Sequence, residues 1–210
     1  MKMIQLKNKK GFTLVELIIA LGVFSAGIMA AFTLALAGLK TSKENYARIQ
    51  SANLAREGIE LIRNARDTNW VKIDANEDCN TGTEEIDLCS WNNGLSSGYY
   101  YTDFVYTIAE VEESSLENIS SCAVCAIYFE DMHVNADNRS FFTMTPTGYL
   151  PTNMKRLIEI KNICEDESIT MGTCSEEIIG LEVISRVYWE LLSKEHYVDV
   201  KEKLYNWKRW

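Results

Sequence analysis

Gly11-Phe12-Thr13-Leu14-Val15-Glu16-Leu17-Ile18-Ile19-Ala20-Leu21 opens the stretch that decides the fold of this chain. From residue 12 to residue 39 the only charge is Glu16, and the leader before this run carries four lysines and no acid. A helix over residues 12–39 would be roughly 42 Å long at about 1.5 Å per residue, whereas the hydrocarbon core of a bilayer is about 30 Å thick. The pattern therefore predicts one membrane-spanning helix with a turn or two to spare.

Glu16 lies in the second turn of this predicted helix, close to the membrane interface. A carboxylate at the bilayer centre costs about 2.5 to 3.5 kcal/mol or more, and the cost is smaller near the edge. The positive end of the helix dipole also favours an acid at this position. Because the lysines precede the apolar run, the leader is expected to stay in the cytoplasm.

Two ordinary interpretations of this N-terminus remain open. A secretory signal peptide would use the small-residue pattern at residues 35–37 as its cleavage site. Its apolar region is normally about 7 to 15 residues long, which is shorter than the run from residue 12 to residue 34. An ordinary membrane anchor predicts the same orientation, but it explains neither the Gly11–Phe12 junction nor the glutamate four residues after it.

Lys9-Lys10-Gly11-Phe12-Thr13-Leu14-Val15-Glu16 resembles the prepilin signal of type IV pilins and type II secretion pseudopilins. The continuation Leu21-Gly22-Val23-Phe24-Ser25-Ala26-Gly27-Ile28 is most similar to minor pilins of the pilus modification type. The resemblance implies that a prepilin peptidase cuts between Gly11 and Phe12 and then methylates the new amine of Phe12. It also implies assembly with other pilin subunits through an assembly platform protein.

Glu16 has a chemical reason to follow the new N-terminus. The amine bared at Phe12 has an ordinary pKa of about 7.7 to 8.0 and is largely cationic at neutral pH, so burial in a filament requires a partner. Glu16 could neutralise its own amine, since residues four apart share a helix face. The resemblance implies instead that it meets the amine of a neighbouring subunit. A membrane precursor would thus become part of an extracellular pilus or a periplasmic pseudopilus.

Residues 40–69 are predicted to continue the helix into water, with Asp67-Thr68-Asn69 ending it. Small and apolar residues recur at intervals of three and four, as in a helix with one buried face. They are Ala47, Ser51, Leu54, Gly58, Leu61, Ile62 and Ala65. The chain thus has a leader at 1–11, an apolar helix at 12–39 and an amphipathic continuation at 40–69.

Residues 70–210 are expected to form an extracytoplasmic domain large enough to bury its own core. Its beginning, residues 71–98, is polar and loop-like. Alternating or short apolar runs predict strands at residues 99–111, 123–130, 139–145 and 156–163. A terminal hairpin follows, in which one face of the first strand is predicted to hold Ile179, Leu181, Val183, Ser185, Val187 and Trp189. The return strand is predicted to begin at Tyr197. A helix followed by antiparallel strands is an α+β order, and the resemblance implies a sheet packed on the exposed half of the helix.

All six cysteines lie beyond the predicted membrane helix, so the outward orientation favours disulfides. They are Cys79, Cys89, Cys122, Cys125, Cys164 and Cys174. Joining neighbours in that order into three local bridges is the simplest pairing, although the spacing leaves other connectivities open. A zinc site using Cys122 and Cys125 is the alternative, but it needs a second close pair. A thioredoxin-like role lacks the surrounding βαβ pattern.

A calcium-loop pattern follows the helix. Asp74, Asn76, Asp78, Asn80 and Glu85 match positions 1, 3, 5, 7 and 12 of such a loop. Cys79 stands where the loop needs glycine, and no amphipathic helix follows. A solvated acidic loop explains the same residues.

The formal net charge is −9, and removal of the four leader lysines leaves 17 basic and 30 acidic residues, or −13. Such acidity disfavours nucleic-acid binding, and with it a competence pseudopilin that aids DNA uptake. The basic cluster near the C-terminus is expected to be a solvated strand end. It comprises Lys201, Lys203, Lys208 and Arg209.

His133 and His196 belong to no catalytic motif, and the chain has no phosphate loop, HExxH or GxSxG. We therefore expect no enzyme and no cofactor. The predicted function is that of a minor pilin-like structural subunit. The alternatives are a type II secretion or competence pseudopilin and a displayed adhesive or ligand-binding module.

Overall fold

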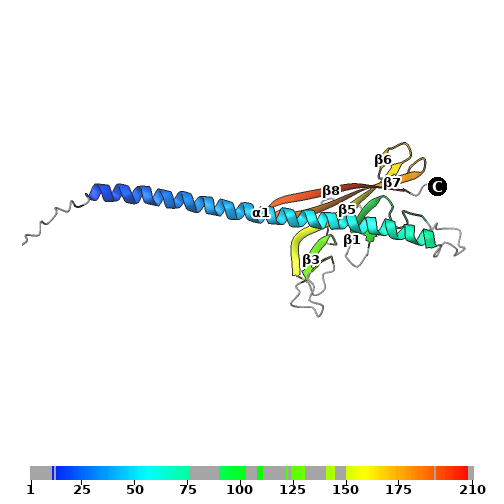
Figure 1. Ribbon diagram of the computed structural model, residues 1–210, viewed down its shortest axis with the longest axis horizontal. Coiled ribbons are helices and arrows are strands. Elements are labelled where there is room, and N and C mark those ends of the chain that lie inside the picture. Colours follow the sequence, from blue (N-terminus) through cyan, green and yellow to red (C-terminus); the bar gives the residue numbers. More distant parts are fainter. Residues whose placement is uncertain are drawn as a thin grey trace, which may run out of the picture. The chain divides into compact units, whose positions relative to one another are not determined.

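The computed structural model describes residues 11, 13–75, 90–102, 108–110, 122, 124–130, 141–144, 150–191 and 193–207. These residues contain one long helix, α1 (Leu14–Ala75), and eight strands, which Figure 1 labels in part. The chain divides into two compact units, residues 1–46 and residues 47–210, and α1 contributes to both. The expected α+β class, with a long N-terminal helix and an antiparallel sheet, is confirmed.

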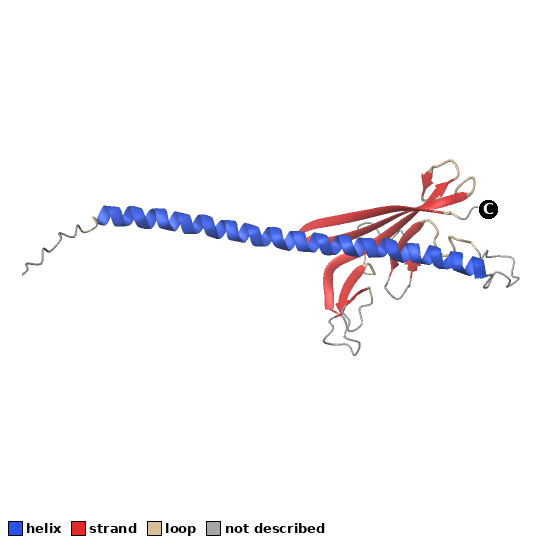
Figure 2. Ribbon diagram, in the orientation of Figure 1, coloured by secondary structure: helices blue, strands red, loops and turns tan. Residues whose placement is uncertain are grey.

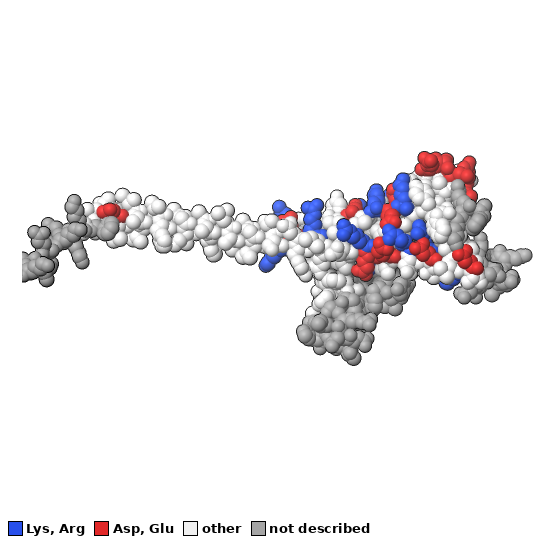
Figure 3. Space-filling view, in the orientation of Figure 1, with Lys and Arg blue, Asp and Glu red and all other residues white. Residues whose placement is uncertain are grey.

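The first unit is an exposed apolar helix. Its surface carries large side chains that soluble proteins normally bury, among them Phe24 and Phe32, which are 67% and 62% exposed. A window of 18 residues in α1 reaches a mean hydropathy of 2.3 with none of its residues buried. Figure 3 shows this part of the helix surface as almost free of charge. Among the described residues, α1 is the one helix long and apolar enough to cross a membrane.

In the second unit, the remaining part of α1 packs on a sheet (Figure 2). The predicted buried face is confirmed at Ser51, Leu54, Gly58 and Ile62, all of which are buried. Ala55 and Ile59, which directly follow Leu54 and Gly58, are also buried and widen this face. Burial of such a face, rather than helix propensity alone, stabilises helices of this kind in water.

The predicted helix end at Asp67-Thr68-Asn69 is wrong, because α1 continues to Ala75. Tertiary contacts extend it. Trp70 is 7% exposed in the main core, and the Asn69 side chain donates hydrogen bonds to the carbonyls of Trp91 and Asn93. Residues 71–75, expected in a loop, are therefore helical.

The sheet is centred on β5 (Leu150–Cys164), which pairs along its length with β7 (Ile178–Leu191). β8 (Lys194–Tyr205) completes the terminal hairpin by pairing with β7. The shorter strands pair with β5 or with each other, all antiparallel. They are β1 (Gly98–Thr102), β2 (Ile108–Glu110), β3 (Ala126–Glu130), β4 (Phe141–Thr143) and β6 (Ile169–Thr170).

The terminal hairpin is confirmed, and its inner face holds Leu181, Val183, Val187 and Trp189 as predicted. The predicted start of its second strand at Tyr197 is wrong, because β8 begins at Lys194, which pairs with Leu191. The single strand expected over residues 99–111 is wrong, since β1 and β2 form an antiparallel pair with Tyr100 opposite Glu110. Apolar and polar residues alternate in each strand of such a pair, so two short neighbouring strands give the same sequence pattern as one long strand. β5 is also longer than predicted and begins at Leu150.

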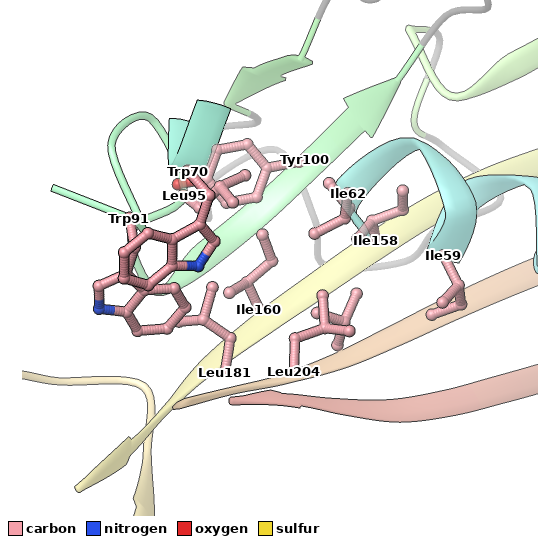
Figure 4. Close-up of a cluster of buried hydrophobic side chains, with 11 residues drawn as sticks. Ile59, Ile62, Trp70, Trp91, Leu95, Tyr100, Ile158, Ile160, Leu181 and Leu204 are labelled. Atoms are coloured by element: carbon pink, nitrogen blue, oxygen red, sulfur yellow. The ribbon is translucent and has the colours of Figure 1, made fainter. Parts of the chain in front are cut away.

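The main core lies between α1 and the sheet (Figure 4). It gathers aromatic and branched side chains from the helix, the turn after residue 90 and four strands. Its buried members are Ile59, Ile62, Trp70, Trp91, Leu95, Tyr100, Ile158, Ile160, Leu181, Val183 and Leu204. A second cluster packs Leu54 and Ala55 of α1 on side chains of three strands, which are Ile127 of β3, Met154 of β5, and Val187 and Trp189 of β7. Helix and sheet thus share one interface.

Candidate functional site

The first turn of α1 is the candidate functional site. The backbone N–H of Leu17 donates to the carbonyl of Thr13 at 3.2 Å, which is the first intrahelical hydrogen bond. The backbone N–H of Glu16 donates to Thr13 Oγ1 at 3.3 Å. Thr13 is therefore the N-cap of α1, and Thr13-Leu14-Val15-Glu16 has the sequence of a capping box.

Glu16 is exposed in the first turn of α1 and is the only charged residue from 13 to 39. An acid here interacts favourably with the helix dipole. Gly11 is exposed outside the helix, and a Cβ added to it would meet no atom within 4 Å. The fold itself therefore does not require glycine at this position. Phe12 lies outside the described residues.

Residues 6–32 match the family described as the prokaryotic N-terminal methylation motif, the signature of type IV pilins and pseudopilins. No curated protein and no solved structure matches the chain. The motif supports a type IV pilin-like or pseudopilin-like protein, and the α+β architecture, a long N-terminal helix packed on an antiparallel sheet, is pilin-like. Such a motif implies processing by a prepilin peptidase and assembly with other pilins, starting from a membrane-anchored precursor.

Two disulfides brace the described part of the second unit. Cys122 bonds to Cys125 and Cys164 bonds to Cys174, with Cα–Cα distances of 5.4 Å and 5.6 Å. Both pairs belong to the simplest connectivity expected from the sequence. Zinc needs thiolate ligands, and the bonded Cys122 and Cys125 supply none. Cys79 and Cys89, the third expected pair, lie outside the described residues.

Of the calcium-loop and histidine candidates from the sequence, the structure describes Asp74 and His196. Asp74 lies in the last turn of α1, whereas Asn76, Asp78, Asn80 and Glu85 fall outside the described residues. His196 stacks on Trp189 at 5.4 Å between ring centroids, so packing accounts for it. His133 is outside the described residues.

In the C-terminal basic cluster, Lys201 and Lys203 are exposed on β8, as a solvated strand end requires. Lys203 lies opposite Glu182 of β7 in the strand register. Lys208 and Arg209 are outside the described residues. The two described lysines thus belong to a surface that also carries acidic residues, rather than to a purely basic patch.

Sequence reasoning did not identify a cavity of about 240 Å³ at the end of the β7–β8 hairpin. Glu190 and Glu195 lie opposite each other in the strand register and both line it. Tyr188 and Lys155, also paired in register, form another part of the wall. No local sequence signal reveals the cavity, because it depends on how β5, β7 and β8 are aligned.

Proposed function

We propose that this chain is a minor pilin-like subunit of a type IV pilus or a related pseudopilus. A prepilin peptidase cuts between Gly11 and Phe12 and methylates Phe12, and the subunit then assembles through its apolar helix. The observation that carries the proposal is a lone acid, Glu16, at the start of an apolar helix whose side chains are exposed throughout residues 14–39. A bilayer first covers that surface and neighbouring helices cover it in the filament.

The residue at which α1 begins indicates which amine Glu16 pairs with. α1 begins at Leu14, so helical i, i+4 geometry starts after Phe12. This favours pairing of Glu16 with the amine of a neighbouring subunit over pairing within its own chain. Two buried charges of opposite sign then neutralise each other and fix the axial register between subunits. Loss of one partner of such a pair costs about 3 to 5 kcal/mol.

Intact-mass measurement of the chain recovered from its native membrane or filament tests the processing step. We expect a product that lacks residues 1–11 and carries one methyl group. A product that retains Met1, or one that begins after residue 37 as a signal peptide would leave it, contradicts the proposal.

The assembly step is tested with Glu16→Ala. This variant should be cleaved like the wild type but should be depleted from sheared filaments, because the amine of its neighbour loses its partner. Thr33→Val is the matched control, since Thr33 Oγ1 donates only to the Ala30 carbonyl of its own helix. It should enter filaments normally. Equal incorporation of both variants would remove Glu16 from the mechanism.

The cavity at the β7–β8 hairpin favours a second candidate function, the display of a ligand-binding module by the helix. Its wall combines Tyr188 with the charged groups of Lys155, Glu190 and Glu195. A glycan array probed with the full chain tests this function, using Glu190→Gln/Glu195→Gln as the comparison. Binding that the double variant abolishes would support display, and absence of binding would leave assembly as the function.

A further inference from the structure

Thr13 sets the point where the chain becomes helical. Its carbonyl accepts the first intrahelical hydrogen bond and its hydroxyl oxygen accepts the N–H of Glu16. An N-cap residue has non-helical backbone angles, so the chain before it leaves the helix. Gly11 and Thr13 both lie outside α1, as this requires. The side chain of Thr13 therefore keeps the helix from extending toward the leader.

The sequence offers other caps upstream. Gly11 and Asn8 are residue types that also start helices, and with either as N-cap Phe12 would become helical. Near a membrane an uncapped first turn is costly, because its N–H groups lack acceptors and water is scarce. Loss of the Thr13 hydroxyl would thus favour a helix that begins earlier. The peptide bond between Gly11 and Phe12 would then lie in a helical turn.

Proteases cleave backbone that is exposed and free of helical hydrogen bonds. We infer that Thr13 is a positioning residue for processing: by capping α1 it keeps the bond between Gly11 and Phe12 ahead of the helix and open to the peptidase. The inference rests on the proposed function, since it takes cleavage after Gly11 as the reaction. Thr13 acts through the backbone and need not touch the peptidase.

The test is the cleavage rate of the full-length chain, reconstituted in liposomes with a prepilin peptidase and followed by mass spectrometry. Thr13→Val keeps the shape of threonine without an acceptor, whereas Thr13→Ser and Thr13→Asn keep an acceptor and change the shape. We expect kcat/KM to fall about five-fold for Thr13→Val, the effect of losing a typical cap, and to stay within about two-fold of wild type for the others. The lower kcat/KM should appear as a higher KM with little change in kcat, because a smaller fraction of the molecules presents an open cleavage site.

Amide hydrogen exchange at Val15 in the same liposomes reports the helix start independently of cleavage. With Thr13 as N-cap the Val15 N–H has no helical acceptor, whereas in a helix that begins earlier it donates to the Gly11 carbonyl, so its exchange should slow in Thr13→Val and stay fast in Thr13→Ser and Thr13→Asn. The inference is overturned if Thr13→Val is cleaved like wild type, or if Val15 still exchanges fast in Thr13→Asn and that variant is cleaved slowly, because shape would then decide. If the wild type itself is not cut after Gly11, the proposed function fails. If the wild type is cut after Gly11 but the cleavage rates of the Thr13 variants do not depend on whether residue 13 caps the helix, only the proposed role of Thr13 fails.

Discussion

Gly58 of α1 lies directly against Ser185 of β7. A Cβ at Gly58 would clash with Ser185 Oγ and would stand 3.2 Å from both Arg156 Cδ and Ile158 Cδ1. Helix and sheet approach so closely here that a side chain at position 58 would force Ser185 to shift. Ser185 Oγ is buried and has no hydrogen-bond partner among the described residues, so the hydroxyl occupies the space that a larger helix residue would need.

Gly58→Ala should destabilise the second unit although alanine is the better helix former. The gain in helix propensity is about 1 kcal/mol, and overpacking of a core costs about 1 to 3 kcal/mol. We expect a net loss of about 1 kcal/mol, measured by denaturant unfolding of the detergent-solubilised chain followed by tryptophan fluorescence. Gly58→Ala/Ser185→Ala should recover most of the loss. Gly38→Ala, where a Cβ meets no atom within 4 Å, is the control and should leave the transition unchanged.

Arg156 ties β5 to the middle of α1. It is 3% exposed and donates from Nη1 to the Leu54 carbonyl at 3.1 Å, while Glu57 Oε1 lies 3.5 Å away. The Glu57 side chain is 37% exposed, so water screens this ion pair. Packing of the arginine stem and the bond to the carbonyl should therefore contribute more than the charge pair.

Arg156→Ala is expected to cost about 2 to 4 kcal/mol, because it opens a cavity and removes a buried donor. Glu57→Gln should cost less than about 1 kcal/mol. A double-mutant cycle between the two, measured by urea unfolding, separates the terms. A coupling energy as large as the whole effect of Arg156→Ala would show that the ion pair dominates.

The two described disulfides should differ in their resistance to reduction. Cys122 and Cys125 are 3% and 0% exposed, whereas Cys174 is only half-buried beside the buried Cys164. A thiolate attacks a sulfur it can reach, so Cys164–Cys174 should be reduced first in the native protein. Alkylation after brief dithiothreitol treatment, read by peptide mass spectrometry, checks the order. In denaturant both bridges should open together, and an unchanged order there would mean that burial is not the cause.

The sequence predicted those features that repeat along the chain. The alternation of Leu181, Val183 and Val187 defined the inner face of β7, and the spacing of Ser51, Leu54 and Gly58 defined the buried face of α1. Features that depend on distant partners were missed. The end of α1 is fixed by Asn69 and residues more than twenty positions away, and the cavity depends on strand register. Thr13 is a different case, since its capping-box pattern was present in the sequence and was overlooked.

Asn69 provides the sharpest test of how the helix end is held. Its amide nitrogen donates to the Trp91 carbonyl at 3.1 Å and to the Asn93 carbonyl at 2.8 Å, both in the turn that packs on Trp70. Asn69→Ala raises local helix propensity but leaves two carbonyls without this donor, at a cost of about 1 to 3 kcal/mol. Amide exchange of residues 70–75 should therefore accelerate while that of residues 54–62 stays slow. Asn64→Ala, at an exposed position of the same helix, should change neither segment. Faster exchange at 54–62 as well would show that the whole second unit, rather than the helix end, depends on Asn69.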